Sequence, residues 1–561
     1  MPTDTATRDR RAWLPWALLA LIPWALGAWA LRFTCDDAYI SFRYARNLAR
    51  GHGLVFNPGE RVEGYTNFAW TMILALGQWL GADAVALSQW LGIACFAATI
   101  GLLLVASRRI SGAPAWIPVA ALGYAAHEHA QLFASCGLET AMFAFLTTAL
   151  LLTLAWARTA RAFALAGALG TLLAMTRPDG LLLCALGGLY ALGRAARGTL
   201  PWRQIVALSL PGLLVYVPYF LWKWSYYGSI VPNTFYAKSA DTAYPQQGLF
   251  YLRLFFGCYW VLALAAVGLA WAALRRPKVR ADAVFADHLP GLALAFVLGY
   301  LAFVAWVGGD FMFARFVLPI TPTLYLGFEL LRRRWPGAPA GLAIAALAVG
   351  GTLLRAYPAE FADRGALRGI GEERTYYPAK EVAMRRVCGE HLRQLFAGQE
   401  ARVGIGGAQA MLAYYGRFEL VIECSTGLTD AHLARLPLPE RSRIGHEKNV
   451  QRDPGYLLRR RVQFLFDTAP RPAGSERHDL IDFGPCWGQI ITYQREMMRH
   501  LRGKPGVQFL DCEAWIDSVL ASVPTMPVPQ VEQLYGVLKP YYFDANDDPE
   551  REAPFKARLG R

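Results

Sequence analysis

Two adjacent carboxylates, Asp36 and Asp37, follow the first long apolar run of the sequence, residues 13–31. A run of this length predicts a membrane helix, so we expect the acidic pair a few residues beyond its outer end. Ionisable side chains at a membrane boundary are costly and are therefore candidates for function. The structural alternative is that they start the next helix, because Asp is a preferred N-cap residue. The rest of the sequence favours chemistry.

Basic residues that suit a phosphate group accompany this pair. Arginine offers a planar fork of N–H donors, and lysine offers a compact positive charge. Lys238 and Arg315 each follow a turn marked by Gly or Pro, and we predict that they bind phosphate. Arg43 is a further candidate, with Arg46 and Arg50 at helical spacing. The alternative is that these arginines lie along an interfacial helix and extend toward lipid headgroups.

The composition indicates a polytopic membrane protein. Of the 561 residues, 55% are hydrophobic and only 17% are charged, which is typical of a chain with many membrane helices. Apolar runs fill residues 12–354, and the sequence beyond Arg355 is ordinary and polar. We therefore predict a membrane domain, residues 1–355, and a soluble α/β domain, residues 356–561, that is large enough to bury its own core.

The distribution of basic residues predicts how the chain crosses the membrane. Short loops rich in Lys and Arg stay in the cytoplasm, which explains most of the net charge of +14 without a nucleic-acid partner. We expect about eleven spans of roughly 20 residues, with the N-terminus in the cytoplasm and the C-terminal domain outside it. The proposed spans are 12–31, 84–106, 113–127, 140–157, 161–176, 179–193, 205–225, 249–274, 289–307, 314–331 and 338–354. Residues 66–80 are expected to lie as a helix in the outer interface.

This topology places the unusual polar residues on one side of the membrane. The outer loops would contain the acidic pair and most of the other carboxylates and amides of the first 355 residues, whereas the inner loops contain little but Lys and Arg. The segregation predicts an active site at the outer boundary between membrane and water.

The cysteines and histidines predict no metal centre. Nine cysteines are spread without the spacing of a zinc site, and the run 127–129 offers too few ligands. The four cysteines of the C-terminal domain could form two disulfides if that domain lies outside the cytoplasm, with the pairing left open. They are Cys388, Cys424, Cys486 and Cys512. No cofactor is predicted, and the need for a divalent cation is left open.

Several motifs resemble those of a known family. In the membrane domain they are residues 36–44, 51–67, 137–140, 177–180, 227–234 and 308–310, and in the C-terminal domain residues 427–430 and 445–448. The chain is similar in these motifs to the C-type (GT-C) glycosyltransferases, specifically the polyprenyl-phosphate arabinofuranosyltransferases. That family includes the terminal β-arabinofuranosyltransferases of mycobacterial cell-wall arabinan and enzymes that decorate bacterial pilin.

The resemblance implies a GT-C fold in the bacterial inner membrane and a polyprenyl-phosphate sugar as donor. The sugar, arabinofuranose in this family, would pass on the periplasmic side to a glycan, a glycolipid or a pilin-like protein. Asp36 or Asp37 would lie at the reacting centre, and Lys238, Arg315 and Arg43 would hold the phosphate. The side chains expected to bind sugar or acceptor are Tyr39, Asn67, Glu139, Asp179, Asn233 and Asp310.

The reacting carboxylate has two roles open to it. It could act as a base on the acceptor hydroxyl, which gives inversion, or as a nucleophile, which gives retention. The β-linked donor and product of the family imply retention. Three alternatives compete with this interpretation: transfer of a different lipid-linked monosaccharide, a lipid or sugar transporter, and an anchored protein that binds wall polymer. Transporters usually contain internal repeats and polar residues at the midplane, and the sequence has neither.

Overall fold

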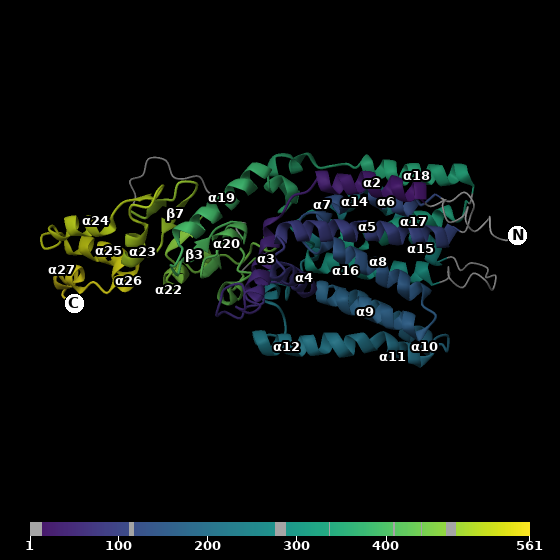
Figure 1. Ribbon diagram of the computed structural model, residues 1–561, viewed down its shortest axis with the longest axis horizontal. Helices are drawn as coiled ribbons and strands as arrows, with labels where there is room; N and C mark the ends of the chain where they lie inside the picture. Colours follow the sequence, from purple (N-terminus) through teal and green to yellow (C-terminus); the bar gives the residue numbers. More distant parts are fainter. Residues whose placement is uncertain are drawn as a thin grey trace.

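The computed structural model describes residues 14–111, 117–274, 288–335, 337–407, 410–438, 440–466 and 478–561. Figure 1 shows an elongated molecule, with a bundle of helices at one end and a smaller part that contains helices and a sheet at the other. Helix α19 (Ala379–Leu395) lies where the two parts meet.

Apolar helices form the bundle, as expected for a helical membrane protein. Within the described residues, three are long and apolar enough to cross a membrane: α5 (Ala84–Ser111), the continuous helix over Trp202–Tyr227, and α16 (Leu289–Val307). A fourth crossing results if α14 (Pro245–Cys258) and α15 (Trp260–Leu274) count as one, although the chain bends by 100° between them. Shorter apolar helices are α2 (Leu14–Ala30), α8 (Thr140–Trp156), α9 (Ala160–Thr176), α10 (Gly180–Ala196) and α18 (Ala338–Leu353). The number of spans stays a prediction.

Two of the proposed spans are wrong as straight crossings. The span 113–127 contains only α6 (Val119–Ala125), whose 7 residues extend about 10 Å, and residues 113–116 lie outside the described residues. The span 314–331 begins as a turn and becomes helical in a 3-10 turn (Leu318–Ile320) that continues into α17 (Thr321–Arg332), about 24 Å in all. Neither length crosses a bilayer core of about 30 Å.

Short helices lie near the acidic pair. They are α3 (Asp36–Ala49), α4 (Phe68–Trp79), α7 (Glu128–Ala134) and α13 (Asn233–Ala237). Helix α4 is the segment expected in the outer interface, and its 12 residues are too few to cross. It packs against α3, so the first polar loop forms a layer over the bundle.

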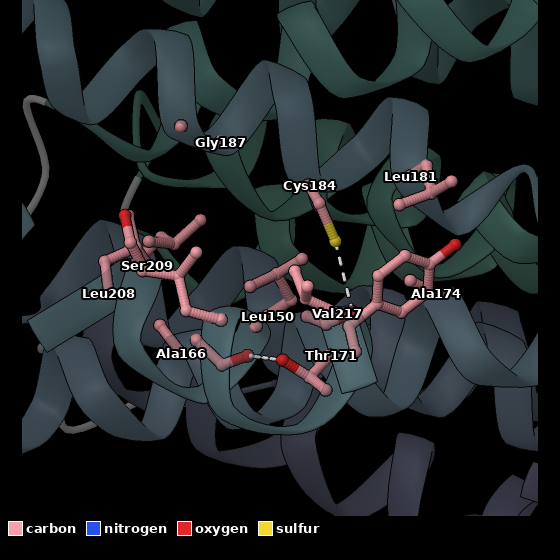
Figure 2. A pocket seen from close by; sticks show the side chains of 17 residues that line it. Leu150, Ala166, Thr171, Ala174, Leu181, Cys184, Gly187, Leu208, Ser209 and Val217 are labelled. Carbon is pink, nitrogen blue, oxygen red and sulfur yellow. Dashed lines mark hydrogen bonds between the residues drawn. The ribbon is translucent and has the colours of Figure 1, made fainter. Parts of the chain in front are cut away.

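A groove of about 320 Å³ runs between α9, α10 and the long helix formed by α11 (Trp202–Pro211), a π-helical turn and α12 (Val217–Tyr227). Figure 2 shows its lining, which is mostly aliphatic. Glycines 170, 187 and 188 leave the space that side chains would otherwise fill. The groove therefore offers an apolar surface inside the membrane part.

Glycines also let helices approach closely. A Cβ atom added at Gly327 of α17 would lie 2.1 Å from the Ala265 carbonyl oxygen of α15. At Gly167 of α9 it would lie 2.1 Å from the Leu208 carbonyl oxygen of α11. Small residues at such crossings allow the backbone contact on which helix packing in membranes depends.

A mixed sheet forms the core of the C-terminal part. Its order is β4-β3-β5-β7-β6-β8, parallel from β4 through β5 and antiparallel beyond. The strands are β3 (Arg402–Ile405), β4 (Leu420–Glu423), β5 (Phe464–Phe466), β6 (Leu480–Asp482), β7 (Trp487–Ile490) and β8 (Gln508–Phe509). A separate hairpin pairs β1 (Ala366–Leu367) with β2 (Ile370–Gly371).

Helices surround this sheet. Besides α19 they are α20 (Ala410–Gly416), α21 (Ala431–Ala434), α22 (Tyr456–Arg459), α23 (Arg495–Leu501), α24 (Cys512–Leu520), α25 (Val528–Leu538), α26 (Asp544–Asn546) and α27 (Pro549–Leu559). Of the four cysteines considered for disulfides, Cys388 of α19 and Cys486 are bonded, with their Cα atoms 5.8 Å apart. The boundary of this domain at residue 356 stays a prediction.

The two parts are joined through α3 and the loop after it. The Asn57 side chain donates to the Val421 carbonyl oxygen (2.9 Å) and accepts from the Val421 N–H (3.0 Å), as a neighbouring strand would. Helix α3 packs along α20 in the same interface. The helix that begins with the acidic pair is therefore buried between membrane part and C-terminal part.

We expect Gly327→Ala to destabilise the protein, because its methyl group would meet the α15 backbone. Overpacking of this kind costs about 1–3 kcal/mol. Gly350→Ala in α18 is the matched control, since no atom lies within 4 Å of its added Cβ and alanine favours a helix. Thermal unfolding of the purified proteins in detergent measures the difference. Equal midpoints for the two variants would contradict the close α15–α17 contact.

Candidate active site

A buried carboxylate, Glu139, lies between two arginines directly before α8. The Asn67 amide donates to its Oε2 (2.8 Å). The Nη1 of Arg177 and the Nη2 of Arg315 both lie 3.4 Å from its Oε1. Burial alone would raise the pKa of Glu139, but the charges of Arg315 and Arg177 lower it. The ionised carboxylate therefore joins α4, α9 and the loop after α16.

Arg177 is held from its other side. It caps the end of α9, and its Nε donates to the Asp179 carboxylate (3.0 and 3.2 Å). The Tyr300 hydroxyl of α16 donates to the same carboxylate. Asp179, predicted to bind sugar, thus has its partners within the protein and supports Arg177 from behind.

The loop after α16 delivers Arg315. It starts with two residues in the left-handed region, Gly308 (φ 94°) and Gly309 (φ 77°), and a Cβ at Gly309 would lie 2.6 Å from the Tyr251 ring. Arg315 Nη1 lies 3.4 Å from the Asp310 carboxylate, whose other oxygen accepts from the Phe311 N–H (2.9 Å). Arg315 is 8% exposed, and its Nε has no hydrogen-bond partner among the described residues. One buried N–H donor of the guanidinium is therefore available to a ligand.

Asp37 faces this cluster from α3. Burial raises the pKa of its carboxyl, while the positive charges of Lys238 and Arg315 oppose the rise and the negative charges of Asp310 and Glu139 add to it. The side chain is half-buried, and no hydrogen bond joins it to another residue of the described part of the chain. A carboxylate beside two cations is thus accessible to a substrate.

Lys238 caps the end of α13, and its positive charge acts on Asp37. A Cβ at Gly445 would lie 3.8 Å from its Cε, so the predicted motif 445–448 packs against this lysine. The neighbouring His446 packs on Phe311, with the ring centroids 5.0 Å apart. Burial, with the charges of Arg443 and Lys238, lowers the pKa of His446 to about 4, so it is neutral at pH 7.

Asp36 points elsewhere, although it is the neighbour of Asp37. Its two oxygens accept from the backbone N–H groups of Ala410 (2.6 Å) and Met411 (2.9 Å), at the start of α20. Burial raises the pKa of Asp36 to about 6, against the effect of these two hydrogen bonds. The geometry gives Asp36 a structural role and leaves Asp37 as the candidate for the reacting centre.

Arg43 is not placed to hold a phosphate as predicted. Its Nε donates to the Phe56 carbonyl oxygen (2.7 Å), and its two Nη atoms donate to those of Ala413 (2.8 Å) and Phe418 (2.9 Å). The guanidinium is 1% exposed and is occupied by the protein. Tyr39 is similarly buried, with its hydroxyl 3.3 Å from that of Tyr415, and does not face a sugar site.

Of the two asparagines predicted to bind sugar or acceptor, Asn67 lies at the charged cluster and Asn233 does not. Asn67 contacts Glu139 directly, and its Oδ1 accepts from Ser41 (3.1 Å) and Thr71 (3.0 Å), so it orients the buried carboxylate. Asn233 instead donates to backbone carbonyls of residues 427–430 at 2.9–3.1 Å. It fixes the C-terminal part on α13, and the geometry argues against a place for it in the sugar pocket.

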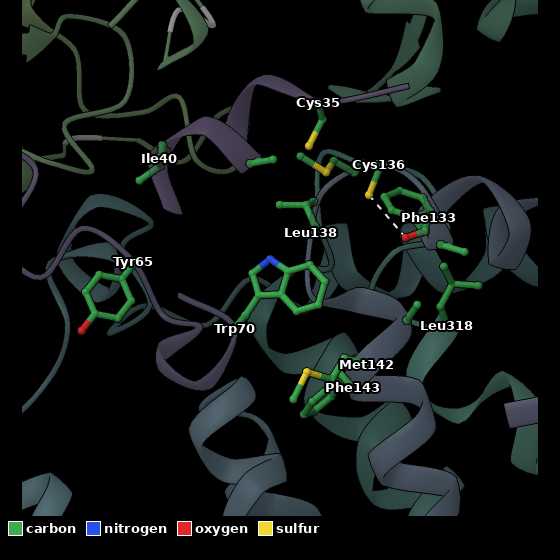
Figure 3. Close-up of a cluster of buried hydrophobic side chains, with 14 of the residues drawn as sticks. Cys35, Ile40, Tyr65, Trp70, Phe133, Cys136, Leu138, Met142, Phe143 and Leu318 are labelled. Atoms are coloured by element: carbon green, nitrogen blue, oxygen red, sulfur yellow. Dashed lines mark hydrogen bonds between the residues drawn. The ribbon is translucent and has the colours of Figure 1, made fainter. Parts of the chain in front are cut away.

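A hydrophobic cluster supports the site from below. Figure 3 shows Trp70 at its centre, between Leu138 and Met142, with Cys35 above. The Trp70 indole donates to the Gly137 carbonyl oxygen (3.1 Å), which fixes the turn that leads into Glu139. The buried indole therefore helps to position Glu139, two residues after Gly137.

Sequence reasoning missed Glu373 and Tyr377. Glu373 is 4% exposed and lies near Asp37, Asp310 and Arg315. Both residues follow the last membrane helix, in a segment assigned to the C-terminal domain. The only signal in the sequence is the adjacent acid pair Glu372-Glu373 after a glycine-rich turn.

No group of three or more His, Cys, Asp or Glu side chains converges as a metal site among the described residues. His129, from the run 127–129, lies between the Tyr259 hydroxyl (2.5 Å) and the Glu372 carboxylate (2.7 Å).

Comparison with known proteins confirms the resemblance seen in the motifs. No protein-family model matches the chain. It is 32% identical over 337 residues to a terminal beta-(1->2)-arabinofuranosyltransferase of Mycobacterium tuberculosis, covering 54% of this chain and 52% of that protein. A protein of the same name from Corynebacterium glutamicum is 31% identical over 332 residues, covering 53% and 47%. The chain spans about half the length of the curated relatives it matches.

In three dimensions the chain is similar to ArnT from Cupriavidus metallidurans, whose crystal structure was determined with undecaprenyl phosphate bound. The TM-score is 0.52 at 16% identity, over 75% of this chain and 88% of that chain. The chain therefore shares a helical membrane fold with ArnT, which agrees with the predicted GT-C architecture.

Asp36→Asn is expected to lower the stability of the protein, because the new amide N–H₂ would face a backbone N–H that has lost its acceptor. An unsatisfied buried donor costs about 1–3 kcal/mol. Asp37→Asn is the matched control, since it removes a charge without a hydrogen-bonding partner in the described structure. Chemical unfolding and limited proteolysis of the C-terminal part measure both. A less stable Asp37→Asn protein would contradict the division of roles.

Proposed function

We propose that this protein is a membrane glycosyltransferase that transfers arabinofuranose from a polyprenyl-phosphate donor to an acceptor outside the cytoplasm. The observation that carries the proposal is one accessible carboxylate, Asp37, beside Lys238 and Arg315 at the polar end of a membrane bundle. The arabinofuranosyltransferase names of the relatives support the choice of sugar. Undecaprenyl phosphate in the ArnT structure supports a lipid-phosphate donor.

Cleavage of the donor releases a phosphate and leaves positive charge on the anomeric carbon. We place the phosphate between Lys238 and Arg315, because the unpartnered Arg315 Nε supplies a donor that is already oriented. Charges fixed before the reaction are commonly the largest contribution to such catalysis. Glu139 and Asp310 hold Arg315 in this position.

Asp37 acts at the anomeric carbon in this proposal. As a base, it takes the proton of the acceptor hydroxyl while that oxygen displaces the phosphate, which inverts the configuration. As a nucleophile, it displaces the phosphate to form a glycosyl ester. The acceptor oxygen then displaces the Asp37 carboxylate and gives its proton to the released phosphate, and the two displacements together retain the configuration. The resemblance favours retention, and the product configuration decides between the two.

The apolar groove along α9 and α10 is the proposed site of the polyprenyl chain. Ala174 lines the groove and lies three residues before Arg177 in the sequence, so about one helical turn separates groove and charged cluster. The long helix on its outer side is not buried within the protein, which supports access from the lipid phase. A donor bound this way would have its phosphate at the polar end of the bundle.

The location and the acceptor follow from the same proposal. The cluster would lie at the periplasmic face of the bacterial inner membrane, and the acceptor would be a glycan, a glycolipid or a pilin-like protein. The Cys388–Cys486 disulfide supports an oxidising compartment for the C-terminal part.

Purified protein should transfer sugar from synthetic polyprenyl-phosphoryl-arabinofuranose, and Asp37→Asn should lose about 10²–10⁴-fold in rate, the range for general acid–base groups. Turnover of this donor tests whether the transferred sugar is arabinofuranose. NMR of the product gives the anomeric configuration of the new bond. Asp36→Asn should lose less activity than Asp37→Asn when both are assayed under conditions in which the variants are folded. Turnover of other lipid-phosphate sugars but not of this donor would contradict the assignment of arabinofuranose as the sugar. It would leave the assignment of the active site unchanged.

Gly188→Phe should raise the KM for a long-chain donor, because the new ring would fill the groove from a position where an added Cβ meets no atom within 4 Å. A short-chain donor that does not need the groove should be affected much less. Gly291→Phe in α16 is the matched control, with equally open surroundings outside the groove. Equal KM values for long-chain donor in the two variants would contradict this assignment.

A further inference from the structure

A short strap after the last membrane helix, residues 366–377, is bonded to the loop that carries Asp310 and Arg315. The Phe313 N–H donates to the Gly371 carbonyl oxygen, and the Gly371 N–H donates to that of Phe311, both at 2.9 Å. Together they form a parallel bridge between Met312 and Gly371. The strap is therefore fixed at the active site by backbone contacts that do not depend on its side chains.

The two glutamates of the strap point in different directions. Glu372 lies 2.7 Å from the His129 imidazole, outside the charged cluster. Glu372 is the extended N-cap of a 3-10 turn that begins at Glu373 (Glu373–Tyr376), so the two side chains leave the backbone in different directions. Glu373 faces Asp37, Asp310 and Arg315 in the cluster. There it is 4% exposed, and Tyr377 of the strap is its hydrogen-bond partner.

The groups around Glu373 leave it with excess negative charge. From α3 and the residue before it, Asp37 and Cys35 face it. From the loop after α16, Asp310 and Arg315 face it, and Arg315 already has Asp310 and Glu139 as partners. No salt bridge joins Glu373 to a cation within the described part of the chain.

We infer that Glu373 carries a proton beside Asp37 and keeps Asp37 as the ionised member of the pair. This rests on the function proposed above and deepens it. Like charges that share a site do not both ionise readily. Glu373 is more buried than Asp37 and lacks the Lys238 charge that Asp37 has, so the proton stays on Glu373. Burial and the Asp37 charge raise the pKa of Glu373 well above its ordinary value, in agreement with the geometry.

Glu373 is a positioning residue in this scheme and forms no bond to the substrate. Its proton removes one negative charge from the neighbourhood of Arg315, where the donor phosphate must bind. Loss of that proton at high pH would add repulsion toward the phosphate and would raise the pKa of Asp37. The wild-type protein should therefore lose kcat/KM for donor as the pH rises through the ionisation of Glu373.

Glu373→Gln tests the inference, because it keeps the shape and a hydrogen-bond donor but cannot ionise. We expect a few-fold lower rate at neutral pH and loss of the alkaline decline of kcat/KM. An alkaline decline like that of wild type would overturn the inference. So would a loss of rate as large as in Asp37→Asn, since it would make Glu373 an ionised catalytic base.

Infrared spectroscopy gives a readout that needs no substrate. At neutral pH, the difference spectrum between wild type and Glu373→Gln should contain the carbonyl band of a protonated carboxyl group. Glu372→Gln is the control, and its difference spectrum should lack this band, because His129 keeps Glu372 ionised. Absence of the band in Glu373→Gln would overturn the inference. If wild type transferred no arabinofuranose, the proposed function would fail, while this measurement would still decide the state of Glu373.

Discussion

A carboxylate buried between two guanidinium groups is the constraint around which the polar end of this protein is built. Glu139 is 2% exposed, and it is stable there only because Arg177 and Arg315 neutralise it and Asn67 satisfies its second oxygen. Removal of one partner of a buried ion pair leaves an uncompensated charge and costs about 3–5 kcal/mol. The start of α8, the end of α9, the start of α4 and the loop after α16 must therefore meet at one point. The contact between these four elements forms the charged cluster, and it does not depend on the identity of the substrate.

The adjacent aspartates of α3 show how a helix gives neighbouring residues separate tasks. Successive side chains of a helix point about 100° apart, so one carboxylate reaches the backbone of α20 while the next faces Lys238 and Arg315. Asp36 fixes the C-terminal part on α3, and that contact in turn fixes the orientation of Asp37. The C-terminal part is thus a structural component of the site as well as a candidate surface for an acceptor.

Residue type and topology together singled out Asp37, Glu139, Lys238, Asp310 and Arg315 in the sequence, because charges on the outer side of a membrane bundle are few and costly. The structure brings these five side chains together, and their roles stay predictions. The same reasoning failed for Arg43 and Asn233, whose partners are backbone carbonyls about 200–370 positions along the chain. Such partners leave no mark in the sequence. Two proposed spans differ from the helices for a related reason, since turns at residue 126 and at residues 313–317 interrupt the apolar runs on which these spans rest. Glu373 was missed because only the backbone bridge of its strap brings it to the site.

The balance of charge in the cluster bears on how it can accept an anion. Carboxyl groups outnumber cations there, since Asp37, Glu139, Asp310 and Glu373 surround Lys238, Arg177 and Arg315, and Asp179 already occupies Arg177. A site with this surplus would repel a phosphate unless a proton or another cation compensated for it. A proton on Glu373 reduces this surplus at a buried carboxyl that, unlike Glu139 and Asp310, has no salt bridge within the described residues. Burial without a cation thus assigns the proton, and the proton lets a carboxylate needed for chemistry coexist with the cations needed for the phosphate.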